Sequence, residues 1–274
     1  MRSIHHHLGR FVILSAVVFS CHIAPSAADE KPVATIWLGD SLTTPNQPAT
    51  IEALLVVGAS RGGTVSGEPL ELVVDGKVVA NAMTGSDGRA KFTYVPAFRG
   101  TKVVTGRTGM TARVSATATA TLAAWERRTP ILVVEMKALS ADATGSDPIP
   151  AAADELGKLT QFYYNVIYVA FDIEGKNEPL QADDRARRWL VEHRFPLGYL
   201  LTVSPGEGAF GNKIDELRAD GWTTLKIGVG RSKPFAEAFV ERRLDVVMVP
   251  EPPKSEIPRK ARVAKDWKEV RKKL

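Results

Sequence analysis

The chain contains very little cysteine and histidine, and this scarcity excludes several kinds of catalytic site. Cys21 is the only cysteine among 274 residues, and four of the five histidines lie within the first 22 residues. A single cysteine forms no internal disulfide and no multi-thiolate metal site. Zinc sites usually take several His or Cys ligands, and a serine-type triad needs a histidine beside its nucleophile. Because His193 stands alone in the rest of the chain, we expect neither chemistry.

Long apolar runs are also lacking. The run Phe11–Phe19 is too short to span a bilayer. It follows Arg2 and Arg10 and precedes the small residues Ser26–Ala28, which is the order of a secretory signal peptide. We therefore predict that residues 1–28 are a signal peptide cleaved after Ala28, and that the protein is exported to the periplasm or the extracellular space.

Cys21 allows one alternative to simple export. It follows Ser20 near the end of the apolar run, as a lipid-attachment cysteine would, although Phe19 fits that pattern poorly. If cleavage follows Ala28 instead, the mature chain has no cysteine and therefore no thiol nucleophile.

The net charge of +5 is unevenly distributed. Nine basic and four acidic side chains follow Pro250, so the excess positive charge belongs to the C-terminal tail and the rest of the mature chain is slightly acidic. A basic tail is not a basic nucleic-acid surface. We expect no specific nucleic-acid partner.

The tail itself, residues 254–274, has a helical pattern. Val263, Trp267, Val270 and Leu274 follow one another at spacings of four, three and four, which predicts a basic amphipathic helix over this segment. Such a helix either docks on the preceding domain or lies on an anionic membrane surface or partner. The sequence leaves both outcomes open.

Residues 32–122 show the pattern of an all-β domain. Asp75-Gly76 separates Leu70–Val74 from Lys77–Val79, which predicts a hairpin with a two-residue turn. Apolar and polar residues alternate over Arg89–Val95, as in a strand with one buried face. Small residues alternate with threonine over Thr111–Leu122, as in an edge or final strand. No long helical period appears, so a β-sandwich is the expected architecture.

Residues 67–106 resemble bacterial immunoglobulin-like modules. The resemblance consists of the hairpin, then a strand with Asp87-Gly88, Phe92 and Tyr94, and a following strand that begins after Gly100. It implies an immunoglobulin-like fold. A fold of this kind does not specify a function.

Residues 129–250 alternate strand-like and helical patterns. The patterns between the strands place apolar residues on one helical face, for example Ala182, Ala186, Trp189 and Leu190. This alternation predicts a three-layer α/β domain with a five-stranded parallel sheet, in which ligands bind beyond the carboxyl ends of the strands. The strand-like runs are Ile131–Met136, Val166–Phe171, Gly198–Val203, Thr224–Gly230 and Asp245–Val249.

The order of these pieces resembles the haloacid dehalogenase-like superfamily, in particular the phosphatidate phosphatase branch with an N-terminal sandwich. The resemblance implies a magnesium-dependent phosphatase with an aspartate nucleophile. Here Glu135 stands at the nucleophile position, Lys137 at the second acid, Ala170 at the phosphate-binding serine and Val229 at a metal-ligand aspartate. Only Lys213 matches. Two lost carboxylates make an octahedral magnesium site untenable, so we expect a pseudoenzyme without a metal or cofactor.

A second register of the same resemblance places the motif at Asp172 and Glu174, with Thr202 as the phosphate-binding residue. It leaves the strand at Ile131–Met136 unexplained. It remains an alternative set of catalytic candidates, beside Glu135.

Basic residues gather near the expected strand ends. Lys137, Lys213, Arg231 and Lys233, with Thr202, are candidates to bind an anion. We therefore predict an exported, non-catalytic binding or scaffold protein that binds an anionic or phosphoryl group. The alternative is a divergent magnesium-dependent phosphatase acting on a phospholipid or a small phosphoester. The natural ligand and protein partners are unknown from the sequence.

Overall fold

The computed structural model describes residues 31–274 except 58–62, 142–146, 172–177, 205 and 207. The predicted signal peptide with Cys21, and the candidates Asp172 and Glu174, lie outside the described residues. No helix of the described part is long and apolar enough to cross a membrane.

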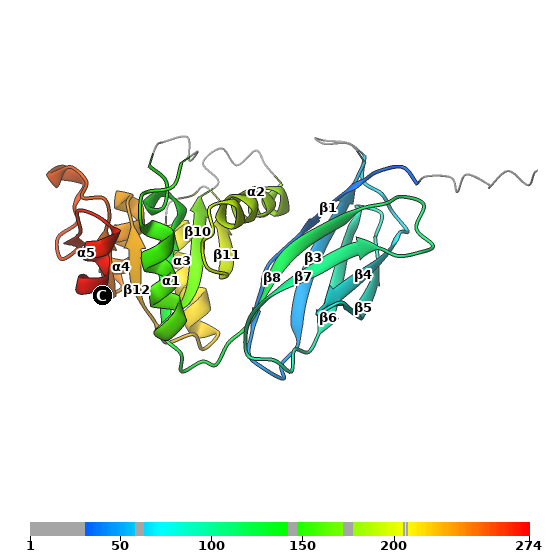
Figure 1. The fold of residues 1–274 in the computed structure, drawn as a ribbon, viewed down its shortest axis with the longest axis horizontal. Helices are drawn as coiled ribbons and strands as arrows, with labels where there is room; N and C mark the ends of the chain where they lie inside the picture. Colours follow the sequence, from blue (N-terminus) through cyan, green and yellow to red (C-terminus); the bar gives the residue numbers. More distant parts are fainter. Residues whose placement is uncertain (1–30, 58–62, 142–146, 172–177, 205, 207) are drawn as a thin grey trace, which may run out of the picture. The chain divides into compact units, whose positions relative to one another are not determined.

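The first domain is a β-sandwich of two sheets (Figure 1). One sheet has the strand order β1-β3-β6 and the other β2-β8-β7-β4-β5. The strands are β1 (Thr35–Leu38), β2 (Ser41–Thr43), β3 (Ala49–Val56), β4 (Pro69–Val74), β5 (Lys77–Met83), β6 (Arg89–Tyr94), β7 (Gly100–Thr108) and β8 (Thr117–Ala124).

Alternation along the strands builds the sandwich core. In β6, Ala90 and Phe92 are buried while Lys91 and Thr93 are exposed, which confirms the alternation predicted for Arg89–Val95. The β4–β5 hairpin is also confirmed. Its turn residues Asp75 and Gly76 have φ angles of 50° and 76°, the left-handed values that a two-residue hairpin turn requires.

The last sandwich strand begins later than the sequence suggested. The alternation predicted a strand over Thr111–Leu122, but β8 runs from Thr117 to Ala124. Ala112 instead closes a turn by donating its N–H to the Gly109 carbonyl at 3.1 Å, and the backbone N–H of Arg113 is bound by Glu68. Side-chain alternation does not reveal such turn hydrogen bonds.

The second domain is built on a parallel sheet of the order β11-β10-β9-β12-β13-β14 (Figure 1). Five parallel strands were predicted and are present, and β14 adds a sixth. The strands are β9 (Ile131–Glu135), β10 (Asn165–Phe171), β11 (Tyr199–Val203), β12 (Leu225–Gly230), β13 (Asp245–Met248) and β14 (Arg262–Val263).

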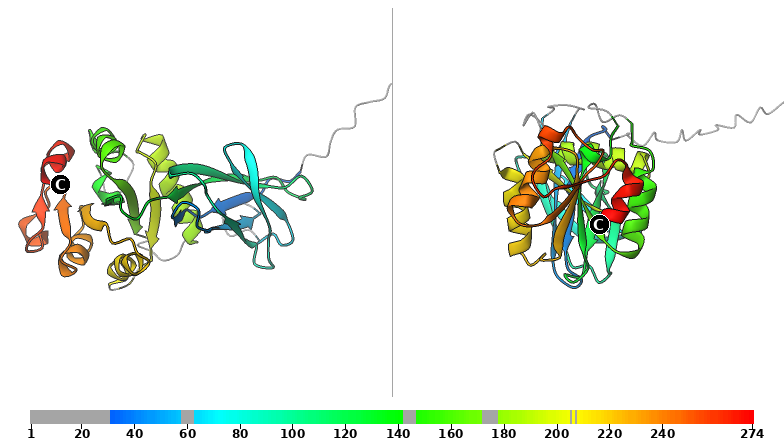
Figure 2. Two further views of the ribbon diagram at one scale, coloured as in Figure 1. Left: turned by 90° about the horizontal axis from the view of Figure 1, so that it is seen from below. Right: turned by 90° about the vertical axis from the view of Figure 1, so that its left-hand side faces the viewer.

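Helices cover both faces of this sheet, as Figure 2 shows on its right. One buried cluster joins the sheet to α1 and α5, and the other joins it to α3 and α4. The three-layer α/β arrangement is therefore as predicted. The helices are α1 (Ala152–Phe162), α2 (Pro179–Glu192), α3 (Ala209–Ala219), α4 (Lys233–Glu241) and α5 (Trp267–Lys273), with single 3-10 turns η1 (Met136–Ala138) and η2 (Lys254–Glu256).

The C-terminal tail docks on the α/β domain, but only its end is helical. Helix α5 begins at Trp267 because Asp266 caps it, accepting the Glu269 N–H at 2.9 Å. Trp267 and Val270 are fully buried, and the Trp267 indole donates to the Ala138 carbonyl at 2.8 Å. Val263, which the helical spacing assigned to the same face, lies in β14 instead. One continuous helix over the tail was therefore wrong.

Candidate functional site

Glu135 ends β9 next to β12, where the strand order reverses direction. In such sheets this is the usual place for a ligand. The Glu135 side chain is fully buried and accepts hydrogen bonds from the backbone N–H groups of Arg231 and Ser232 at 2.6 and 2.8 Å. The Ser232 hydroxyl donates to it as well, at 2.5 Å. Since Ser232 is the N-cap of α4, the helix terminus that could bind a ligand anion already binds this carboxylate.

The predicted cations do not form one cluster of unpaired charges. Arg231 donates to the Ser140 carbonyl at 3.3 Å. Lys213 pairs with Glu216 at 2.6 Å and Lys233 with Glu237 at 3.6 Å, each partner one turn away on the same helix. Lys137 is exposed in the turn after β9. Among the predicted site residues that the structure describes, only Glu135 and Arg231 contact each other through a hydrogen bond, from the Arg231 backbone N–H to the Glu135 carboxylate.

Magnesium does not fit the residues at this edge of the sheet. The cation prefers hard oxygen ligands in octahedral geometry, but both Glu135 oxygens accept hydrogen bonds from Arg231 and Ser232. Within the described ranges, no group of three or more His, Cys, Asp or Glu side chains could hold a metal ion. We derive no metal-dependent step from this site.

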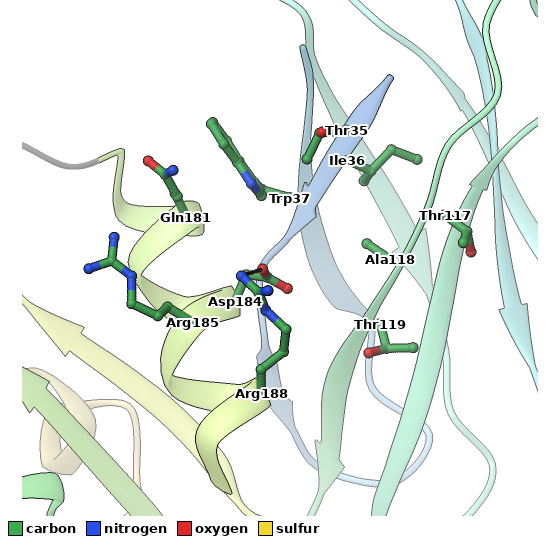
Figure 3. Close-up of a pocket in the computed structure, with 10 residues that line it drawn as sticks. All are labelled: Thr35, Ile36, Trp37, Thr117, Ala118, Thr119, Gln181, Asp184, Arg185 and Arg188. Carbon is green, nitrogen blue, oxygen red and sulfur yellow. Dashed lines mark ion pairs between the residues drawn. The ribbon is translucent and has the colours of Figure 1, made fainter. Parts of the chain in front are cut away.

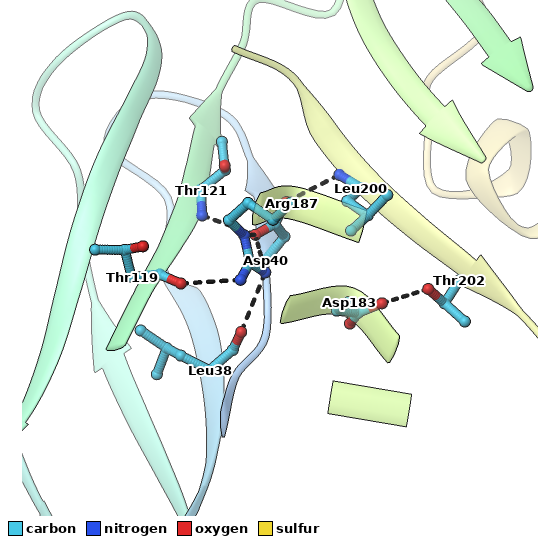
Figure 4. A network of polar contacts seen from close by, with 8 residues as sticks. All are labelled: Leu38, Asp40, Thr119, Thr121, Asp183, Arg187, Leu200 and Thr202. Carbon is cyan, nitrogen blue, oxygen red and sulfur yellow. Dashed lines mark hydrogen bonds and ion pairs between the residues drawn. The ribbon is translucent and has the colours of Figure 1, made fainter. Parts of the chain in front are cut away.

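A different polar site joins the two domains, and the sequence did not reveal it. Asp40 lies in the turn between β1 and β2, and its side chain is 1% exposed. It accepts the N–H groups of Thr121 in β8 at 2.7 Å and of Leu200 in β11 at 2.9 Å. It also pairs with Arg187 of α2, at 2.7 and 3.0 Å (Figure 4).

Arg187 completes this network by bonding backbone carbonyls of the sandwich. It donates to Thr119 in β8 at 2.9 Å and to Leu38 in β1 at 3.2 Å. Unpaired N–H and C=O groups at strand edges cost free energy when they are buried. The Asp40–Arg187 pair therefore replaces missing strand partners for β1, β8 and β11 and fixes the two domains against each other.

Asp183 lies one turn before Arg187 on α2, and its pKa differs from that of an ordinary carboxyl group. Burial raises the pKa of Asp183 to about 6, although the hydrogen bond from the Thr202 hydroxyl acts in the opposite direction. Burial, aided by the nearby charges of Asp40 and Asp183, raises the pKa of the Tyr199 phenol. Thr202, predicted as an anion ligand, thus serves an acid of the same protein (Figure 4).

An open groove lies beside this network, between the sandwich and α2, and we call it the α2 groove. It has a volume of about 570 Å³. Strands β1 and β8 line one side, including Trp37 and Thr119, and α2 lines the other (Figure 3). The contribution of α2 is Gln181, Asp184, Arg185 and Arg188. These four positions share one helical face because their spacing is three, one and three.

The charges in the α2 groove are partly unpaired. Arg188 pairs with Asp184 at 2.9 Å, but its side chain is 73% exposed. Arg185 is exposed and has no hydrogen-bond or ion-pair partner in the part of the chain that the structure describes. A guanidinium group offers a planar fork of donors to a carboxylate, sulfate or phosphate. The groove therefore has the chemistry of an anion-binding site.

The sequence of α2 contains one indication of the buried Asp40–Arg187 network. The apolar face was predicted from Ala182, Ala186, Trp189 and Leu190, but the buried residues of α2 are Leu180, Arg187 and Leu190. Arg187 shares the helical face of Leu180 and Leu190, at spacings of seven and three. A charged residue on an apolar face indicates a buried partner. The sequence does not say that the partner is Asp40.

No family model and no curated protein matches the chain. Solved structures resemble part of it. The CARDB domain of a Pyrococcus furiosus protein is 18% identical, with 34% of this chain and 97% of that one covered and a TM-score of 0.26. The Ig1-2 module of a Drosophila receptor protein tyrosine phosphatase is 13% identical, with 38% and 61% covered and a TM-score of 0.27. The D00-D0 domain of intimin is 17% identical, with 35% and 50% covered and a TM-score of 0.22.

The predicted membership of the haloacid dehalogenase-like superfamily is wrong by these comparisons. No model of such a family matches, and the neighbours are β-sandwich modules of the immunoglobulin-like kind. The physical reason is that the pattern used for the prediction is not specific, because alternating strands and helices produce parallel sheets in many unrelated proteins. Glu135, which was aligned with the nucleophile, instead accepts hydrogen bonds at the N-terminus of α4.

Proposed function

We propose that this chain is an exported, non-catalytic binding protein whose ligand carries a negative charge and binds in the α2 groove. The observation that carries this proposal is Arg185, an exposed guanidinium that has no partner among the described residues and lines a groove of about 570 Å³. A ligand anion would supply the negatively charged partner for the Arg185 guanidinium.

The fixed position of the groove walls supports binding. Helix α2 forms one wall, and Arg187 on its buried face anchors it to β1 and β8, which form the other. Trp37 in β1 also packs on Leu180 of α2. A site whose walls are held before binding loses less conformational entropy when the ligand arrives.

The residues of the groove favour binding over catalysis. Among the described residues that line it, Asp184 is the only carboxylate, and it is paired with Arg188. The one histidine of the described chain, His193, packs against Trp189 with ring centroids 4.6 Å apart and is not among the residues that line the groove. General acid–base catalysis needs a titrating group within reach of the substrate.

Export is supported by the order of charged, apolar and small residues over positions 1–28. The scarcity of cysteine and the sandwich architecture are compatible with work outside the cytoplasm. Expression in a bacterium followed by N-terminal sequencing of the periplasmic protein tests this part. We expect a mature chain that begins at Asp29.

Titration of the ¹⁵N-labelled protein with sulfate and with phosphate at low ionic strength tests the binding site. We expect amide shift changes centred on α2 near Arg185 and Arg188. The double variant Arg185→Gln/Arg188→Gln should weaken binding about tenfold or more, since charge-assisted hydrogen bonds contribute roughly 1.5–3 kcal/mol.

Arg128→Gln is the matched control, because its side chain is 83% exposed and lies outside the groove. It removes one positive charge and should leave the titration unchanged. Equal loss of binding in this control would show a nonspecific charge effect and contradict the proposal. Release of phosphate from a generic ester would contradict the non-catalytic assignment.

A further inference from the structure

A second groove lies between the start of β7 and the C-terminal end of α1, and we call it the Tyr164 groove. It has a volume of about 330 Å³. None of the described residues that line it is acidic, basic or a histidine; among them are Gly100, Thr101, Gly157, Gln161, Tyr164 and Asn165. A groove without charged side chains has nothing to compensate an ionic ligand. Its chemistry differs from that of the α2 groove.

Amide groups supply the polar contacts of the Tyr164 groove. The side chains of Gln161 and Asn165 line it, and neither has a hydrogen-bond partner in the described part of the chain. Each amide offers both donors and an acceptor. Such groups match hydroxyl and acetamido groups, which also donate and accept.

Aromatic rings continue from the groove onto the protein surface. Tyr164 lines the groove, and the ring centroid of Tyr163 lies 6.5 Å from it. The ring centroids of Phe162 and Tyr163 are 6.2 Å apart, and these two side chains are 67% and 63% exposed. Three consecutive aromatic residues form a larger exposed apolar surface than isolated ones, and surfaces of this kind mark binding sites.

Gly157 lines the groove at a position where a glycine is unfavourable. It lies inside helix α1, and glycine weakens a helix interior relative to alanine. A Cβ atom added at Gly157 would meet nothing within 4 Å. Tight packing therefore does not require glycine here. A longer side chain added at this position would extend into open space along the groove.

We propose that the Tyr164 groove binds a neutral saccharide chain. A sugar ring has an apolar C–H face and a rim of hydroxyl groups. The apolar face stacks on Tyr164, the rim bonds to Gln161 and Asn165, and further rings of the chain lie along Tyr163 and Phe162. A mostly apolar surface with a few oriented polar groups is the usual composition of a small-molecule site. This site is independent of the proposed anion site.

Isothermal titration of the purified protein with chitohexaose and with cellohexaose tests this proposal. We expect at least one of these neutral hexamers to bind, and Tyr164→Ala to weaken it about tenfold through the lost stacking contact. Sulfate binding in the α2 groove should be unaffected. Absence of binding to both hexamers by the unmodified protein overturns the proposal.

Variants at Gly157 separate binding from folding, because Tyr164 also packs against the domain core. Gly157→Gln places a neutral side chain in the groove and should weaken hexamer binding at least tenfold without lowering the melting temperature. Asp154→Gln places the same side chain at an exposed position of α1 outside the groove and should leave binding within twofold. Unchanged affinity in Gly157→Gln, or hexamer-induced amide shifts confined to α2 near Arg185, places the saccharide elsewhere and overturns the proposal.

Discussion

Asp183 is a largely buried acid whose protonation changes above the range of ordinary carboxyl groups. Burial raises the pKa of Asp183 to about 6, well above the ordinary value of 3.8. The folded protein therefore favours the protonated carboxyl more than the unfolded chain does. The free energy of unfolding therefore decreases as the pH rises from about 4 to about 6. Above that range the full destabilisation is present.

Asp183→Asn should remove this dependence. The variant is expected to be more stable than the unmodified protein at pH 7, by up to about 3 kcal/mol for a shift of two pKa units. The two proteins should approach equal stability near pH 3, where Asp183 is mostly protonated in both the folded and the unfolded state. Urea unfolding at a series of pH values measures the difference.

Asp215→Asn is the control for this series. The hydrogen bond from Arg242 lowers the pKa of Asp215, an exposed side chain, so its charged form is favoured in the folded state. Its small contribution is present at neutral pH and is lost as the pH falls. A constant difference between Asp183→Asn and the unmodified protein from pH 4 to pH 7 would show that Asp183 is not perturbed.

Among the elements, α2 has two functions on opposite faces. The face with Arg187 and Leu190 is buried against the sandwich and the sheet, while the face with Arg185 and Arg188 lines the α2 groove. The same helix therefore joins the domains and presents the candidate ligand-binding residues. A helix fixed by buried contacts positions its exposed side chains more accurately than a loop does.

Helix α5 shows how much of a short element's stability comes from its packing. An isolated helix of seven residues is not stable in water. Here Trp267 and Val270 enter the buried cluster beside α1, and the indole N–H is bound by Ala138. The basic residues Lys268, Arg271 and Lys272 remain on the exposed side.

Trp267→Ala should therefore destabilise the α/β domain by about 3–5 kcal/mol, the usual effect of truncating a large buried side chain and leaving a cavity. Lys268→Ala, at the exposed neighbouring position, should change stability by less than about 0.5 kcal/mol. Urea unfolding followed by circular dichroism compares the two. A loss below 1 kcal/mol in Trp267→Ala would mean that the tail docks only loosely in solution.

At the scale of the whole molecule, residues 31–274 form one compact unit although they contain two kinds of fold. The Asp40–Arg187 pair contributes to this unity because it bonds strands of the sandwich and the outer strand β11 of the parallel sheet. Removal of one partner of a buried ion pair leaves an uncompensated charge. The interface should therefore be sensitive to either residue.

Arg187→Met should lower the free energy of unfolding by about 3–5 kcal/mol. Asp40→Asn combined with Arg187→Met should be more stable than Arg187→Met alone, because no buried charge is left unpaired. Arg188→Met, which breaks an exposed pair on the same helix, should cost less than about 1 kcal/mol. Urea unfolding monitored by tryptophan fluorescence and by circular dichroism measures these differences.

Coincident transitions for the two probes are expected in the unmodified protein, since its domains share this buried network. Separate transitions in the unmodified protein, or a negligible effect of Arg187→Met, would show that the domains unfold independently and that the pair does not hold them together.

The sequence alone determined most elements of this protein and their grouping into two domains, but not β14 or the start of β8. Alternation in Arg89–Tyr94, the Asp75-Gly76 turn and five apolar runs predicted a sandwich followed by a parallel sheet, because local backbone and burial preferences act over a few residues. The tertiary structure decided where the charged groups lie. Asp40 and Arg187 are 147 positions apart, Glu135 and Ser232 are 97 apart, and no local pattern encodes such pairings. Both candidate grooves depend on how separate elements pack, so their residues could not be found before the fold was known.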